Sequence, residues 1–122
     1  MNRLALTLFL AFLVAGCSSY GWFRDWNRIN IAKIEPGMTR AQVIQTMGEG
    51  SYSASSGQVS NPEKRETIKD AKGVEYEVLY YYTEQIGQKK WEEGITPVVL
   101  SGGKVVGKGW KQLEAIKAIK KS

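Results

Sequence analysis

The sequence predicts an α+β domain, with two N-terminal helices, a group of strands and a C-terminal amphipathic helix. Three observations predict this class. Apolar residues recur at helical spacing in the first part of the chain, they alternate at strand spacing over residues 74–83, and helical spacing returns after residue 110. A chain of 122 residues has room for one modest core, so a single domain is expected.

The first sixteen residues are expected to form an export signal. A short polar start containing Arg3 leads into a nearly unbroken apolar run over residues 4–15. A helix that spans a bilayer needs about 20 apolar residues, whereas the apolar region of a signal peptide is shorter. We therefore expect a signal peptide over residues 1–16 and no spanning anchor.

Cys17 is preceded by a segment that resembles the bacterial lipobox, which consists here of Leu13, Val14, Ala15, Gly16 and Cys17. The resemblance implies that a diacylglyceryl group joins the sulfur of Cys17 and that signal peptidase II, recognising residues 13–16, cleaves before it. Small residues at 15 and 16 suit a narrow peptidase site. Each buried methylene adds about 0.8 kcal/mol of membrane affinity, so two or three acyl chains hold a protein firmly.

The alternative is an ordinary secretory signal that happens to contain a cysteine. Cys17 is the only cysteine in the chain, so it has no internal disulfide partner, and a free thiol is unusual in an oxidising compartment. Acylation is therefore favoured. The residue after Cys17 is Ser18 and not Asp. By similarity to Gram-negative lipoproteins, this implies that the protein is exported to the periplasmic face of the outer membrane. The inner membrane is the less favoured location.

The charge of the mature chain narrows the classes of partner. Cleavage leaves 106 of the 122 residues and removes Arg3, which lowers the net charge from +5 to +4. This charge suits anionic lipid head groups, acidic glycans or an acidic protein surface. Nucleic acid is not expected, because the protein is exported and its basic residues are scattered.

A lipidated tether over residues 17–23 is expected to lead into the domain, residues 24–122. Trp22 and Phe23 end this tether, and Trp26 follows them. These rings have two interpretations: they lie at the head-group level of the membrane, or they cover the core from the start of the first helix. The second is favoured, because the positions of three apolar residues approach helical spacing: Trp26, Ile29 and Ile34.

The two N-terminal helices have defined ends. The first is predicted over residues 24–34, because Pro36 removes a backbone donor and disfavours helical geometry before it. Thr39 and Gln42 have the spacing of a capping box, so the second helix is expected to begin at Arg40. It should end near residue 48, where a glycine can serve as the C-cap.

The amino-acid composition changes at residue 49. Residues 49–72 are rich in Ser, Gly, Asn and charged residues and are predicted to be a loop with at most one ragged strand. Residues 74–83 alternate and should form a strand. The more apolar of its two faces should contact the helices: Val74, Tyr76, Val78, Tyr80 and Tyr82. Tyr81 would then be exposed on the other face.

A hairpin and a helix complete the chain. A polar segment, residues 84–94, precedes a strand at 95–100, and Gly102-Gly103 should turn it back into Val105 and Val106. The last helix is predicted over residues 110–121. Its basic end has two interpretations, compensation of the helix dipole or contact with a membrane surface, and its lysines are Lys117, Lys120 and Lys121.

The start of the second helix resembles the corresponding segment of the SmpA/OmlA (BamE-like) family of small outer-membrane lipoproteins, in the motif Ile34-Glu35-Pro36-Gly37-Met38-Thr39-Arg40-Ala41-Gln42-Val43 with Met47-Gly48. The resemblance implies two helices packed on a three-stranded antiparallel sheet, to which this chain adds its C-terminal helix. It also implies an accessory role in β-barrel assembly. Residues 49–72, residues 84–94 and that helix depart from the family, so the chain resembles a divergent member.

The composition predicts a protein without catalytic activity, cofactor or metal. The chain has no histidine, and its carboxylates do not cluster at catalytic or metal-ligand spacing, so Glu75 and Glu77 are interpreted as a solvated face. We expect a scaffold or interaction module that binds an envelope protein. The alternative is an inhibitor-like or ligand-binding lipoprotein that occludes an envelope enzyme or binds a cell-wall component. The oligomeric state stays open.

Exposed aromatic residues beside basic residues make usable contacts with a partner. On this ground we expect the partner to be bound through four residues: Tyr81, Lys89, Lys90 and Trp91.

Overall fold

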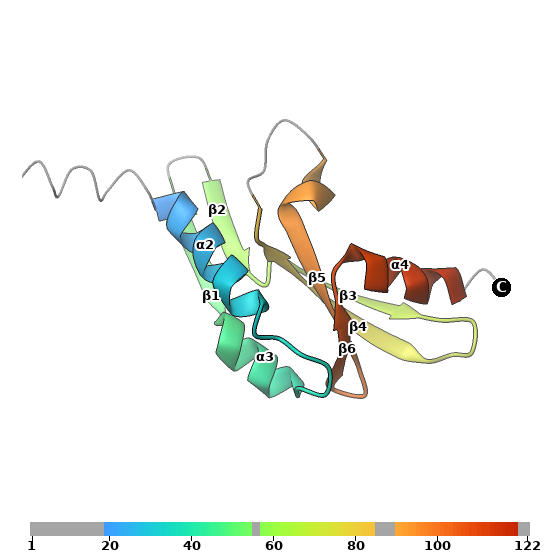
Figure 1. Ribbon diagram of the computed structural model, residues 1–122. Coiled ribbons are helices and arrows are strands. Elements are labelled where there is room, and N and C mark those ends of the chain that lie inside the picture. The colour runs from blue at the N-terminus through green and yellow to red at the C-terminus, as the bar shows by residue number, and fades with distance from the viewer. Residues whose placement is uncertain (1–18, 55–56, 85–89, 120–122) are drawn as a thin grey trace, which may run out of the picture.

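The computed structural model describes residues 19–54, 57–84 and 90–119 (Figure 1). Its helices are α2 (Ser19–Ile31), α3 (Arg40–Met47) and α4 (Trp110–Ile119), with a short 3₁₀ helix, η1 (Trp91–Gly94). Its strands are β1 (Gly50–Ala54), β2 (Gly57–Asn61), β3 (Lys64–Lys69), β4 (Glu75–Tyr82), β5 (Ile95–Ser101) and β6 (Lys104–Lys108). The fold is therefore α+β.

The predicted architecture, two helices on a single three-stranded sheet with an added C-terminal helix, is wrong. The described residues contain a four-stranded antiparallel sheet in the order β3-β4-β5-β6 and a separate two-stranded sheet, β1-β2. Strands β1, β2 and β3 all lie within residues 49–72, which were predicted to be a loop.

These three strands escaped prediction because their side chains give little hydrophobic alternation. Strands β1 and β2 consist mainly of small or polar residues, and their ladder includes a contact of 3.0 Å between the hydroxyls of Ser51 and Ser60. Strand β3 is an edge strand in which exposed and half-buried positions alternate. Charged side chains are common on such edges, where they discourage pairing with other chains. Backbone pairing with neighbouring strands therefore stabilises these three strands more than burial of an apolar face does.

Both faces of the four-stranded sheet are covered, so β4 is buried on both faces from Val78 to Tyr82. Val78, Tyr80 and Tyr82 lie in one core, which includes Leu113 and Ile116 of α4. The other core lies against α3 and contains these buried residues: Ile31, Ile34, Val43, Met47, Leu79, Tyr81, Val98, Leu100 and Val105. Helices thus contact both faces of β4, although Val74, which was predicted to face them, precedes the strand and is 41% exposed. The side of Tyr81 was expected to be solvated, and that expectation is wrong.

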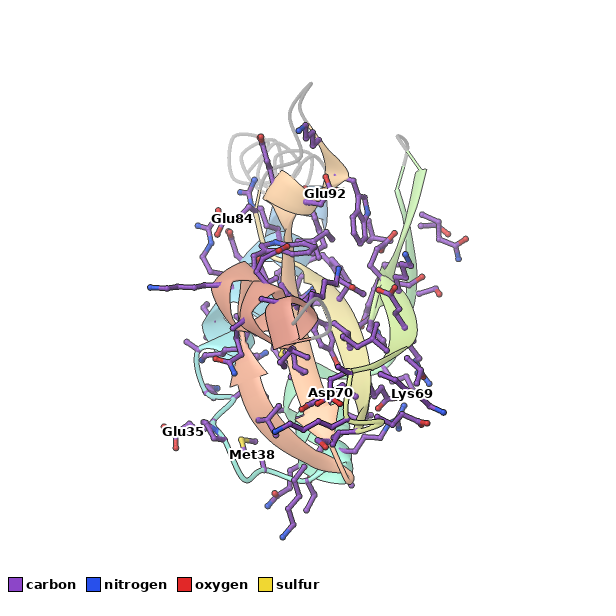
Figure 2. All side chains as sticks on the ribbon, turned by 90° about the vertical axis from the view of Figure 1, so that its right-hand side faces the viewer. Glu35, Met38, Lys69, Asp70, Glu84 and Glu92 are labelled. Carbon is purple, nitrogen blue, oxygen red and sulfur yellow. The ribbon has the colours of Figure 1, made fainter. Side chains whose placement is uncertain are left out.

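The predicted start of α3 is confirmed. Thr39 Oγ1 accepts a hydrogen bond from the amide of Gln42 at 3.1 Å, and the amide of Thr39 donates to Gln42 Oε1 at 2.9 Å. The preceding turn is joined to β6, because the amide of Gly37 donates to the carbonyl of Val105 at 2.8 Å. Figure 2 shows Glu35 and Met38 together at this turn, where the Glu35 amide donates to Met38 Sδ at 3.2 Å.

The hairpin between β5 and β6 is also confirmed. Gly102 and Gly103 have φ values of 59° and 76°, which are backbone conformations that residues with a side chain rarely adopt.

Helix α2 differs from its prediction, since it begins at Ser19 and ends at Ile31 and not at residues 24 and 34. The segment predicted as a tether therefore includes the first turn of α2. The helix crosses the end of the sheet, because Phe23 joins the core beneath α4 and Ile31 joins the core beneath α3.

Two buried asparagines fasten α2 to the rest of the domain. Asn27 Nδ2 donates to Asn61 Oδ1 at 2.8 Å and to the carbonyl of Tyr82 at 2.9 Å. In return, Asn61 Nδ2 donates to Asn27 Oδ1 at 2.7 Å and to the carbonyl of Met47 at 2.9 Å. The amide pair thus connects α2, the end of β2, the end of β4 and the end of α3.

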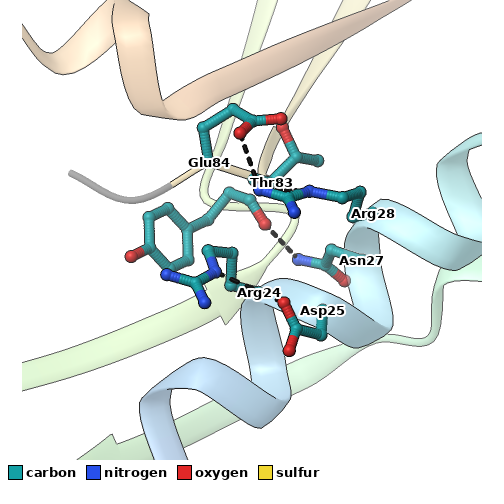
Figure 3. A network of polar contacts seen from close by, with 7 residues as sticks. Arg24, Asp25, Asn27, Arg28, Thr83 and Glu84 are labelled. Carbon is teal, nitrogen blue, oxygen red and sulfur yellow. Dashed lines mark hydrogen bonds and ion pairs between the residues drawn. The ribbon is translucent and has the colours of Figure 1, made fainter.

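A more exposed contact lies beside Asn27, on the next residue of α2 (Figure 3). Arg28 Nη2 lies 2.7 Å from Glu84 Oε2, and Arg28 Nε donates to the carbonyl of Thr83 at 3.3 Å. About half of each charged side chain is exposed, so solvent screens the ion pair and its contribution to stability is small. The buried amide pair is therefore the stronger attachment of α2.

We predict that Asn27→Ala lowers the free energy of unfolding by about 2–4 kcal/mol, because it removes three buried hydrogen bonds, two shared with the Asn61 side chain and one to the Tyr82 carbonyl. Urea unfolding of the purified protein measures the change. Asn30→Ala is the matched control, since Asn30 is also buried on α2 but its side chain bonds to Lys33 nearby in the chain. Equal effects of the two substitutions would contradict the prediction.

Tyr81 generates a second prediction. Its ring is fully buried, and its hydroxyl makes no hydrogen bond to any described residue. Burial raises the pKa of this phenol well above its usual value. Tyr81→Phe removes only the unpaired hydroxyl, so we expect stability at pH 7 to stay equal or to rise by up to about 1 kcal/mol.

The same substitution should change the response to alkali. Above pH 10, the ordinary pKa of tyrosine, the unfolded phenol releases its proton while the buried phenol keeps it. The wild type therefore loses stability as pH rises through this range, by about 1.4 kcal/mol per pH unit for this group. Tyr81→Phe should lose less over the same interval. Identical pH profiles for the two proteins would show the prediction to be wrong.

Candidate functional site

The four residues predicted to bind a partner do not form one surface. Tyr81 is buried beneath α3, so its prediction as a contact residue is wrong. Lys89 lies outside the described residues. Lys90 is exposed just before η1, and Trp91 is partly exposed at the start of η1. At most Lys90 and Trp91 remain together as a candidate contact.

Trp91 belongs to an aromatic cluster that joins η1 and α4 to the four-stranded sheet. Its ring centroid lies 5.5 Å from that of Tyr80, which in turn lies 5.8 Å from the ring of Trp110. Lys64 Nζ lies 5.7 Å and 5.8 Å from the ring centroids of Tyr80 and Trp91, within the range of cation–π attraction. These contacts join η1 and α4 to the strands, so we interpret the cluster as structural.

A cavity of about 330 Å³ lies where the start of α3 meets the sheet. Its walls are Arg40, Thr67, Glu75, Glu77, Leu100, Gly102 and Gly103. Arg40 Nε and Glu77 Oε1 are 2.7 Å apart, and this hydrogen bond raises the pKa of Arg40. Glu77 was interpreted as part of a solvated face, whereas it pairs with Arg40 at the rim of this cavity. The two charged groups neutralise each other.

The most distinctive surface is an exposed apolar stripe on α2 together with one ring from β1, which we name the aromatic face. It consists of Trp22, Trp26, Ile29 and Tyr52, with exposed fractions of 55%, 46%, 63% and 47% respectively. The three helical positions are four and then three residues apart, so they lie along one side of α2. Exposed apolar surface of this kind commonly marks an interaction site.

The rings of the aromatic face contact one another and the core. Trp22 stacks on Trp26 with centroids 5.9 Å apart, and it meets Tyr52 edge-on at 6.0 Å. Tyr52 in turn lies 4.9 Å from the buried ring of Phe23. Trp26 Nε1 donates to the carbonyl of Met47 at 3.3 Å, which joins the face to the end of α3.

The two interpretations of the N-terminal rings therefore apply to different residues. Phe23 is 2% exposed and covers the core, as the favoured interpretation required. Trp22 and Trp26 are about half exposed and lie outside both buried clusters. The helical spacing of Trp22, Trp26 and Ile29 is present in the sequence. It would have indicated an exposed stripe if the buried side of α2 had been assigned to four other residues: Phe23, Asn27, Asn30 and Ile31.

The remaining predicted sites lie at or beyond the ends of the described chain. Cys17 and the recognition residues 13–16 precede it, although Cys17 is only two residues before α2. Lys117 lies in the last turn of α4, and Lys120 and Lys121 follow the described residues. Within residues 19–54, 57–84 and 90–119, no three acidic, cysteine or histidine side chains gather as metal ligands would. No described helix is long and apolar enough to cross a membrane.

Comparisons with known proteins place the chain in a family. No curated protein and no solved structure shows significant similarity to it. A family described as "Protein of unknown function (DUF3192)" matches residues 18–115, which include nearly all of the described domain and the whole aromatic face. The match begins directly after Cys17. The chain therefore belongs to the DUF3192 family.

Proposed function

We propose that the chain is a membrane lipoprotein that faces the periplasm and serves as a non-catalytic interaction module of the cell envelope. One observation carries this proposal: the folded domain begins two residues after the lipobox cysteine, since α2 starts at Ser19 and its first core residue is Phe23. Acyl chains on Cys17 would hold the domain directly against the bilayer.

The surface supports an interaction role. The aromatic face offers three large exposed rings, whereas the cavity beside α3 presents an arginine and a glutamate that are already paired. The absence of histidine from the sequence and the lipobox context of the single cysteine agree with a binding module. We propose that this module acts in outer-membrane protein assembly or envelope integrity, a role supported by the resemblance of residues 34–43 to the SmpA/OmlA lipoproteins.

Replacement of Cys17 tests the anchor. Cys17→Ala removes the sulfur that would receive the diacylglyceryl group, so the protein should stay unprocessed and incorporate no labelled palmitate. Radiolabelled palmitate and the intact mass of the purified protein measure the two effects.

Ser18→Ala is the matched control, because it changes the neighbouring residue and keeps the lipobox. This control should be acylated and processed as the wild type is. Palmitate incorporation by Cys17→Ala at the wild-type level would refute the proposed lipoprotein.

A further inference from the structure

We infer that the aromatic face is a membrane-contacting surface, which lies in the lipid head-group layer with α2 along the bilayer plane. This inference rests on the proposed function, because the acyl chains of Cys17 place the start of α2 at the bilayer. It adds a partner, the lipid surface itself, and an orientation of the domain on that surface.

The reach of the chain keeps the aromatic face close to the anchor. Two extended residues span at most about 7 Å, and the helix rises about 1.5 Å per residue, so the Cα atom of Trp22 lies within about 12 Å of that of Cys17. The interfacial layer is roughly 5–8 Å thick on each side of the hydrocarbon core. A helix lying along the bilayer therefore places its side chains in this layer without any long spacer.

The arrangement of the rings favours that orientation. Trp22, Trp26 and Ile29 lie along one side of α2, so they reach the same depth only when the helix axis runs parallel to the bilayer plane. Tyr52 adds a ring from β1 beside Trp22, which widens the face beyond a single helix. Trp and Tyr are the residues that prefer the head-group level, because their rings are apolar and their N–H and O–H groups are polar.

The elements around the aromatic face carry few charges, and those of α2 are paired. Strands β1 and β2, with the sequences GSYSA and GQVSN, contain no charged residue. Helix α2 carries two arginines, and each has a carboxylate partner: Arg24 lies 3.4 Å from Asp25, and Arg28 lies 2.7 Å from Glu84. The approach of this part of the molecule to lipid therefore brings few charges without a partner into the head-group layer.

A fixed orientation follows from these contacts. Figure 1 shows the turn between β3 and β4 on the far side of the molecule from the start of α2, and α4 also lies away from that start. The turn between β3 and β4 would thus face away from the membrane, toward soluble or other envelope partners. Lys117, in the last turn of α4, would not share the lipid contact of the aromatic face.

Quenching of tryptophan fluorescence by brominated lipid tests the inference on the full mature protein. The protein is reconstituted into vesicles of phosphatidylethanolamine and phosphatidylglycerol, with and without bromine on the upper acyl chain. Two of the four tryptophans belong to the aromatic face, so wild-type fluorescence should fall by roughly half. The double variant Trp22→Phe/Trp26→Phe should show almost no quenching.

Trp91→Phe is the matched control, because it removes another exposed tryptophan by the same substitution and should be quenched at least as strongly as the wild type. Wild-type protein that is not quenched overturns the inference. Equal quenching of the double variant also overturns it. A third result would also overturn it: if neither brominated lipid nor aqueous iodide quenches the tryptophans of the aromatic face and the protein has the mass of a dimer, a second copy of the chain covers the face.

The mass of each preparation separates this inference from the proposed anchor. An acylated protein without quenching refutes the membrane contact and leaves the lipoprotein standing. Quenching of a protein that carries no acyl chain refutes the anchor and supports the membrane contact. When acylation and quenching are both absent, both proposals fail.

Discussion

The arrangement of this domain depends on one reciprocal pair of hydrogen-bonded amides, Asn27 and Asn61. Their four side-chain N–H groups all have acceptors, two within the pair and two on the carbonyls of Met47 and Tyr82. A buried amide is costly when its partners are missing and nearly neutral when they are present. Because these partners come from four different elements, the pair is satisfied only when α2, β2, α3 and β4 have all reached their places.

The position of α2 links this interaction to the proposed function. Asn27 faces the domain, while Trp22, Trp26 and Ile29 face solvent from another side of the same helix. The amide pair therefore determines the direction in which the aromatic face points. If α2 could rotate relative to the sheet, a membrane bound to the aromatic face would have no defined angle to the sheet. In the proposed orientation, the attached helix would present the same side of the domain to soluble partners in every copy of the protein.

The parts of the fold that the sequence predicted correctly depend on local chemistry. The capping box of Thr39 and Gln42 and the Gly102-Gly103 turn each act over a few residues, so their spacing is sufficient to indicate them. Strands β1 to β3 escaped prediction because pairing with distant segments stabilises them. Tyr81 was misplaced because alternation predicts one solvated face, whereas helices cover both faces of this sheet. No local pattern indicates that Asn27 bonds to a residue 34 positions away.

The distance between α2 and the sheet tests the central claim most directly, that the amide pair holds α2 in one orientation. Nitroxide labels on Asp25→Cys and Lys72→Cys, two exposed positions, report this distance by pulsed electron paramagnetic resonance. Once Cys17 is acylated, the introduced cysteines are the only free thiols. The account predicts a single narrow distribution that broadens when Asn27→Ala is added. A distribution that stays narrow in Asn27→Ala, or one that is already broad with Asn27 in place, would contradict it.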